Sequence, residues 1–161
     1  MVAIWGPTFS GNVGHMYTGS MDGTKTYTSQ FPRKYEQSNK SMQNMTYGRK
    51  ATALAEGGLP ASLFAVTVPD IDEFLKEAQR HRDMENWGKF SMWDKQSTSC
   101  TEAGVGALGQ GGFPWYSFGD GIQPFATPQI MPEVVRQELL LRSLGGAKIR
   151  RLDPKMYYGE K

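Results

Sequence analysis

The first patterned stretch of the chain consists of two short runs of strand-forming residues separated by a turn signal. Residues 13–20 predict one strand, and residues 24–31, rich in Thr, Tyr and Phe, predict a second. The pair Asp22-Gly23 lies between them and favours a two-residue turn with positive φ. The sequence therefore predicts a hairpin in which Met21 faces Thr24 and the pairing runs outward from there.

An apolar run and a helix follow after a polar interval. Residues 63–68 are apolar and bounded by prolines, which suits a short buried strand. Asp70 then has the character of a helix N-cap, and Glu73 stands three residues further on. A helix is predicted from there to about Arg82. Its apolar face comprises Ile71, Phe74, Leu75 and Ala78.

Two more helices are predicted in the second half of the chain. A Ser/Thr cluster precedes a run of small residues that begins at Cys100, and Gly111-Gly112 ends that run. Residues 132–144 form an amphipathic pattern that opens on proline and closes on a glycine pair. Residues 148–152 predict a last strand. The segments 34–60, 83–98 and 113–130 lack a clear period and predict irregular structure.

The order of these elements is a hairpin, a strand and three helices, which is typical of the α+β class. With 161 residues, the chain is long enough for one domain spanning residues 1–161. A net charge of +2, from 18 basic and 16 acidic residues, is too balanced to indicate a nucleic-acid partner. The chain contains no run of about 18 apolar residues, so the sequence predicts no membrane span. The N-terminus lacks the basic start and apolar core of a secretory signal.

Cysteine and histidine usage narrows the possible chemistry. The single cysteine, Cys100, rules out an internal disulfide and a cysteine-cluster zinc site. The two histidines, His15 and His81, share no metal-ligand spacing. We therefore expect no metal and no cofactor.

Cys100 falls at the predicted start of its helix, which favours reactivity. The helix dipole and the exposed backbone N–H groups of a first turn stabilise a thiolate. The same groups can bind the oxyanion of a tetrahedral intermediate, and we assign them to Ser99 and Thr101. A lone cysteine is also commonly a small buried apolar residue, so this position alone does not establish a nucleophile.

His15 is the candidate general base. It lies in the first predicted strand, and a strand-borne imidazole facing a helix-borne thiolate is a workable Cys–His pair. The competing interpretation is a histidine that only serves the core or the surface. His81 lies in a charged stretch that resembles a solvated helix end, so it is a poor catalytic candidate.

The hairpin geometry nominates a third residue to orient the imidazole. In the predicted register His15 lies opposite Gln30, and directly opposed residues share a face within contact range. Gln30 is therefore the first choice and Thr28 the second. A register slip of one residue would put Ser29 there instead. The carboxylate alternatives are Asp70 and Asp72.

Three segments in this order resemble the circularly permuted papain-like (NlpC/P60-type) hydrolases of bacterial polymorphic toxins and secretion-system effectors. The first is Val13-Gly14-His15 with the hairpin that follows, and the second is the strand and helix around Val68-Pro69-Asp70. The third is residues 97–112, similar to the family's nucleophile helix, and residues 127–135 resemble its closing helix. The likeness covers residues 10–145. Ser99 stands where the family usually has Asn, which preserves the capping function.

The resemblance implies a permuted papain-like fold with a Cys nucleophile, a His base and a polar third residue. It also implies delivery as an effector or toxin domain, one that could be the C-terminal part of a longer protein, and a cognate immunity protein as partner. We expect cleavage of amide bonds in peptidoglycan peptides, in the periplasm of a target cell.

Two other functions stay open at this point. The first is a lipid acyltransferase, a phospholipase or a protein-modifying enzyme of the same fold, with aromatic side chains at a membrane interface. The second is a non-catalytic binding domain. The aromatic residues concerned are Trp87, Trp93, Phe113, Trp115, Tyr116 and Phe118. Core and lid packing is the more ordinary role for at least half of them.

Overall fold

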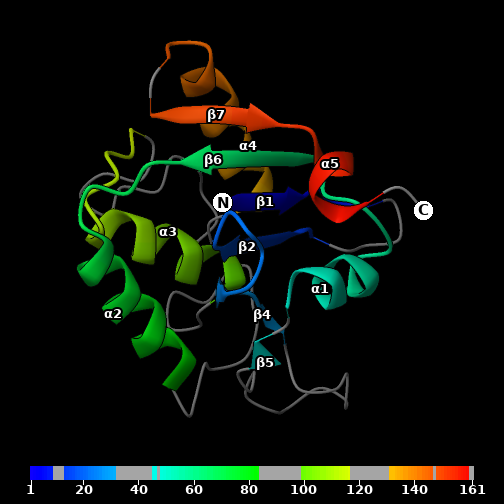
Figure 1. Ribbon diagram of the computed structural model, residues 1–161, viewed down its shortest axis with the longest axis horizontal. Coiled ribbons are helices and arrows are strands. Elements are labelled where there is room, and N and C mark those ends of the chain that lie inside the picture. The colour runs from blue at the N-terminus through cyan, green and yellow to red at the C-terminus, as the bar shows by residue number, and fades with distance from the viewer. Residues whose placement is uncertain are drawn as a thin grey trace.

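The computed structural model confirms the α+β class: a small antiparallel sheet is packed between helices (Figure 1). The structure describes residues 1–8, 13–31, 45–46, 48–83, 99–116, 131–146 and 148–159. The segments predicted around Trp87, Trp93, Phe118 and residues 127–130 lie outside this described part.

The main sheet has five strands in the order β3-β2-β1-β6-β7, and every neighbouring pair is antiparallel. Figure 1 shows β1 in the middle, with β2 on one side of it and β6 and β7 on the other. A separate two-stranded ribbon pairs β4 with β5. The strands are β1 (Val2–Trp5), β2 (His15–Gly19), β3 (Thr26–Thr28), β4 (Gln30–Phe31), β5 (Met45–Thr46), β6 (Ser62–Val66) and β7 (Ile149–Leu152).

The helices cover both faces of the sheet. On one face, α2 (Ile71–Asp83), α3 (Cys100–Gln110) and α4 (Pro132–Ser143) enclose a core that includes Met16 and Phe64. On the other face, α1 (Arg49–Ala55) and α5 (Pro154–Tyr158) pack against a second cluster with Trp5 and Tyr17. Successive strand residues point to opposite faces, so one strand supplies both cores.

Local sequence signals explain the helix boundaries that were predicted correctly. Asp70 accepts a hydrogen bond from the Glu73 backbone N–H at 3.1 Å, as an N-cap does. Pro132 occupies the first turn of α4, as expected. The predicted apolar face of α2 is only half right. Phe74 and Ala78 are buried, whereas Ile71 and Leu75 are exposed because only one edge of that stripe meets α3 and the sheet.

The predicted hairpin register is wrong by one residue over its outer part. Gly19 pairs with Thr26, as the sequence predicts, but a bulge follows and Thr18 pairs with Thr28. The turn is also wider than predicted: Ser20 and Lys25 pair across four residues, with Asp22 accepting hydrogen bonds from Ser20 and Thr24. A bulge inserts one unpaired residue and shifts everything beyond it, and no residue type announces it.

Four elements were not predicted. The central strand β1 was missed, and β5 and α1 both lie in a segment predicted to be irregular. The short α5 follows β7. Among the helices of the described residues, none combines the length and the apolar character that a membrane crossing requires.

Candidate active site

Cys100 is the first residue of α3, as its surroundings predict. Ser99 caps the helix: its hydroxyl accepts from the Glu102 backbone N–H at 3.1 Å, and its own N–H donates to the Glu102 carboxylate at 3.0 Å. This reciprocal pair is a capping box, and it fixes where the helix begins. The Cys100 side chain is half-buried, and its sulfur lies 3.8 Å from the Thr101 hydroxyl.

The surroundings of Cys100 keep its thiol protonated. Burial raises the pKa of Cys100 above its ordinary value, and the negative charge of Glu56 adds to this effect. Hydrogen bonds from the backbone of Met16 and from Thr101 act in the opposite direction without cancelling it. Cys100 is therefore a neutral thiol at pH 7 and needs a base before it can attack a substrate.

The start of α3 is held against β2 by a close contact. Gly104 lies one turn after Cys100 on the same side of the helix, and a Cβ at Gly104 would lie only 2.7 Å from the Met16 Cε atom. The absence of a side chain at Gly104 lets the helix approach Met16. Cys100 is thereby placed beside the residue that follows His15.

His15 opens β2 and is almost fully buried, with 3% of its surface exposed. Gly14 precedes it with a φ of +93°, and a Cβ there would lie 2.4 Å from the Trp5 carbonyl oxygen. Only glycine fits this bend. The His15 ring stacks on Phe31 with a centroid distance of 4.2 Å and lies 6.1 Å from the ring of Trp5.

Hydroxyl groups hold one side of the His15 ring. Its Nε2 atom lies 3.0 Å from the Ser29 hydroxyl, which lies 2.8 Å from the Thr52 hydroxyl on α1. Thr52 in turn donates to the Gly48 carbonyl oxygen at 3.0 Å. On the other side, His15 Nδ1 lies 3.9 Å from a carboxylate oxygen of Glu56, the C-cap residue of α1.

Burial lowers the pKa of His15 to about 3. The ring is therefore neutral at physiological pH, and its contact with Glu56 is not an ion pair under those conditions. A neutral imidazole can accept a proton, so this charge state is the one that a general base requires.

In the described part of the chain, neither of the predicted third residues contacts the His15 ring. The bulge shifts the register by one residue, so that Phe31 rather than Gln30 stacks on the His15 ring, and Ser29, two residues earlier on the same face, reaches its Nε2 atom. Ser29 and Phe31 both meet His15, so Gln30 between them points away. It is buried, and no described residue forms a hydrogen bond with its amide. Thr28 hydrogen-bonds Thr18 at 2.7 Å.

The two residues predicted to line an oxyanion site have different surroundings. The hydroxyl and backbone N–H of Ser99 are both committed to the capping box. Thr101 is buried next to Cys100 at the second position of α3, where a backbone N–H has no carbonyl within the helix to bond.

Cys100 and His15 approach the start of β2 from different sides. Met16 faces α3, so the neighbouring His15 side chain points to the opposite face, toward α1. Glu56 connects the two, since it lies beside His15 Nδ1 and its charge acts on Cys100. In the described part of the chain, no hydrogen bond joins the Cys100 thiol to the His15 ring.

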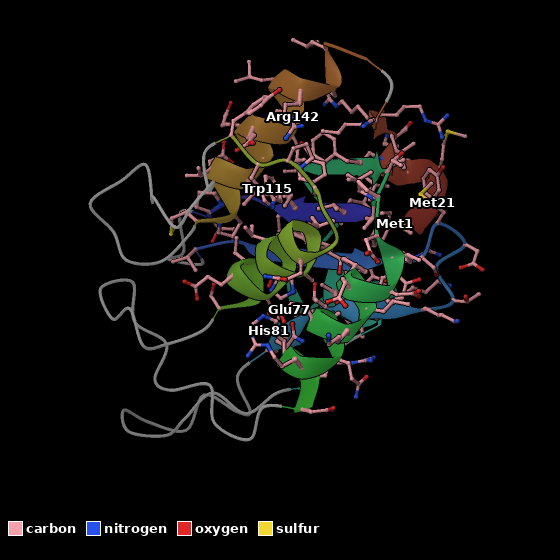
Figure 2. The ribbon with its side chains drawn as sticks, turned by 90° about the vertical axis from the view of Figure 1, so that its left-hand side faces the viewer. Met1, Met21, Glu77, His81, Trp115 and Arg142 are labelled. Atoms are coloured by element: carbon pink, nitrogen blue, oxygen red, sulfur yellow. The ribbon has the colours of Figure 1, made fainter. Side chains whose placement is uncertain are left out.

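The remaining candidates lie elsewhere. His81 is buried on α2, where its Nε2 atom lies 3.2 Å from Glu77 (Figure 2). Asp72 is exposed on the first turn of α2, and Asp70 caps that helix. Trp115 and Phe113 are engaged in packing: Trp115 donates to the Val105 carbonyl, and Arg142 lies over the Phe113 ring. Tyr116 is exposed, but Arg142 also lies over its ring.

Two residues at the His15 ring were not foreseen. Thr52 and Glu56 are spaced four apart, so they share one side of α1. Their only sequence signal is that spacing, which falls in a segment predicted to be irregular. Pairing between α1 and the ring is a tertiary contact, which local pattern does not encode.

Within the described residues, no group of three or more His, Cys, Asp or Glu side chains is arranged to hold a metal ion. No protein-family model, curated protein or solved structure matches this chain.

Proposed function

We propose that this chain is a cysteine hydrolase of the permuted papain-like kind, in which Cys100 is the nucleophile and His15 the base. The observation that carries the proposal is the position of Cys100. It begins a capped helix and is hydrogen-bonded to the backbone of Met16, the residue directly after a buried, neutral histidine.

The charge states determine how the reaction would proceed. Because burial raises the pKa of Cys100 and lowers that of His15, the resting pair is thiol and imidazole rather than thiolate and imidazolium. His15 then takes the thiol proton as the sulfur attacks the substrate carbonyl. Collapse of the tetrahedral intermediate forms a thioester, and His15 returns the proton to the departing amine. A water molecule that gives its proton to His15 then hydrolyses the thioester, and His15 passes that proton to the departing Cys100 sulfur.

Attack requires the thiol and the imidazole to meet at the start of β2. The two groups approach the start of β2 from different sides, so the Cys100 side chain has to turn toward His15 before its sulfur attacks an electrophile. Catalytic hydrogen bonds commonly tighten only when substrate is bound.

We propose an amide bond of a peptidoglycan peptide as the substrate, and an antibacterial effector as the biological role. These assignments rest on the resemblance of the motifs. A cognate immunity protein and action in the periplasm of a target cell belong to the same proposal.

Purified sacculi test the substrate directly. Wild type should release soluble muropeptides, and Cys100→Ser should release none, because serine keeps the size of the side chain but is a far weaker nucleophile. Phospholipid vesicles incubated in parallel report the alternative lipid activity. Release of fatty acid that depends on Cys100, without muropeptides, would replace the peptidoglycan assignment. No Cys100-dependent product from either would support a binding domain.

Expression in bacteria tests the compartment. The chain should be toxic when fused to a periplasmic signal and harmless without it, and Cys100→Ser should remove the toxicity of the signal fusion. If the chain were toxic only without the signal, its target would lie in the cytoplasm, and this result would argue against cell-wall cleavage.

A further inference from the structure

Ser29, Thr52 and the Gly48 carbonyl form a chain of hydrogen bonds that ends at an atom that can only accept. Thr52 donates its hydroxyl hydrogen to the Gly48 carbonyl oxygen at 3.0 Å. A threonine hydroxyl has one hydrogen, so toward Ser29 it can act only as acceptor. Ser29 must therefore donate its own hydrogen across the 2.8 Å contact to Thr52.

The same counting fixes the proton on the His15 ring. With its one hydrogen directed at Thr52, the Ser29 hydroxyl can only accept from His15 Nε2, which lies 3.0 Å away. Nε2 therefore carries the N–H. A neutral imidazole has a single N–H, so Nδ1 has a free lone pair.

The other side of the ring agrees with this assignment. His15 Nδ1 lies 3.9 Å from the Glu56 carboxylate oxygen, which is beyond hydrogen-bonding distance. If Nδ1 carried an N–H, that group would donate to the Glu56 carboxylate, and we would expect a shorter distance between them. The stacked Phe31 ring keeps the imidazole plane in place, so Nδ1 stays directed at this side.

We propose that Ser29 and Thr52 are positioning residues that hold His15 in its Nε2–H tautomer and present Nδ1 as the proton acceptor. The part of Nδ1 as acceptor for the Cys100 proton rests on the proposed function. The tautomer itself does not, because it follows from the hydrogen-bond chain alone. Helix α1, which the sequence did not predict, thereby supplies one of the residues that set the chemistry of His15.

Nitrogen-15 NMR of protein labelled at histidine reads the tautomer without substrate. At pH 7 the His15 ring should show a pyrrole-type Nε2 and a pyridine-type Nδ1, and the His81→Gln spectrum identifies which signals belong to His15. A pyrrole-type Nδ1 in wild type would overturn the proposal at once, whatever the variants do.

Variants at Thr52 test the relay. Thr52→Val removes the acceptor for Ser29, so the Ser29 hydroxyl should turn to donate to Nε2 and the tautomer should reverse. Thr52→Ser keeps the hydroxyl and should keep the wild-type pattern. Thr18→Val removes a hydroxyl from the other buried pair, Thr18 and Thr28, and should leave the His15 signals unchanged. An unchanged tautomer in folded Thr52→Val would contradict the relay. The result is readable even if no hydrolysis is ever found.

Discussion

At the scale of single residues, burial decides the charge of His15. The ring lies between Phe31 and Trp5, and burial lowers its pKa to about 3, against about 6.5 for an exposed histidine. At a pH between these two pKa values, His15 is protonated in the unfolded chain and neutral in the folded chain. The free energy of unfolding therefore falls as pH is lowered through that window, and the contribution is fully present above pH 6.5.

This pH dependence can be measured by urea denaturation of wild type and His15→Gln at pH 7, 5 and 4. Wild type should lose stability relative to the variant as the pH falls, because glutamine cannot be protonated. Parallel curves for the two proteins would mean that His15 is not buried as a neutral ring.

The residue scale also separates what the sequence could predict from what it could not. Cys100 at a helix start and His15 in a strand follow from local pattern. The partners of His15 do not: a bulge between Thr18 and Gly19 shifts the register, so Gln30 points away and Ser29 and Phe31 meet the ring. Thr52 and Glu56 reach the ring from a helix that local pattern does not reveal.

At the scale of elements, the start of α3 depends on the protonation of its capping box. Burial raises the pKa of Glu102 to about 7, although its hydrogen bond from the Ser99 backbone lowers it. The folded chain thus holds a proton between pH 4.5 and 7 that the unfolded chain has lost. The stability contributed by protonated Glu102 is present at low pH and is lost as pH rises through 7.

Glu102→Gln tests this directly. The amide oxygen can still accept from Ser99, but it carries no charge to bury. The variant should be more stable than wild type at pH 8 and equal to it at pH 4, as measured by urea denaturation. A loss of stability at pH 8 would mean that the charged carboxylate is favourable at this cap.

Two glycines of α3 should respond oppositely to alanine. At Gly104 a Cβ would meet Met16 at 2.7 Å, whereas at Gly106 the nearest atom lies at 3.5 Å, an ordinary contact. Gly106→Ala should raise the free energy of unfolding by about 0.5–1 kcal/mol, since alanine suits a helix better. Gly104→Ala should lower it by about 1–2 kcal/mol, because overpacking costs about 1–3 kcal/mol.

Thermal and urea unfolding of the two variants decides the matter. If Gly104→Ala raised the free energy of unfolding as much as Gly106→Ala, the Met16 side chain would have to move aside easily. In that case the close approach would not be what positions Cys100 against β2.

Elements with strong local signals were predicted well. Helices α2 and α3 have side-chain caps, α4 opens on proline, and β6 is an apolar run between prolines. The missed α1 has no side-chain cap, and the missed β1 has only four residues. Short elements of this kind are defined by what they pair with rather than by their own sequence.

At the scale of the whole molecule, the start of β2 lies between the two residues that we propose to react. The helices α2, α3 and α4 bring Cys100 to one face, and α1 encloses His15 on the other. The strand β2 belongs to both faces, so its first residues are where the thiol and the imidazole can meet. The α+β class follows from the order of elements, but this division between faces depends on β1 and α1, which only the structure reveals.

The central claim is that His15 acts as the base for Cys100, and alkylation measures it most directly. Cys100 is the only thiol in the chain, so the rate of reaction with iodoacetamide at pH 7 reports on it alone. His15→Gln should slow alkylation by about 10²-fold, the scale of a general base. His81→Gln, which removes the other histidine, should not slow it. An equal rate in wild type and His15→Gln, no faster than that of the urea-unfolded chain, would contradict the account.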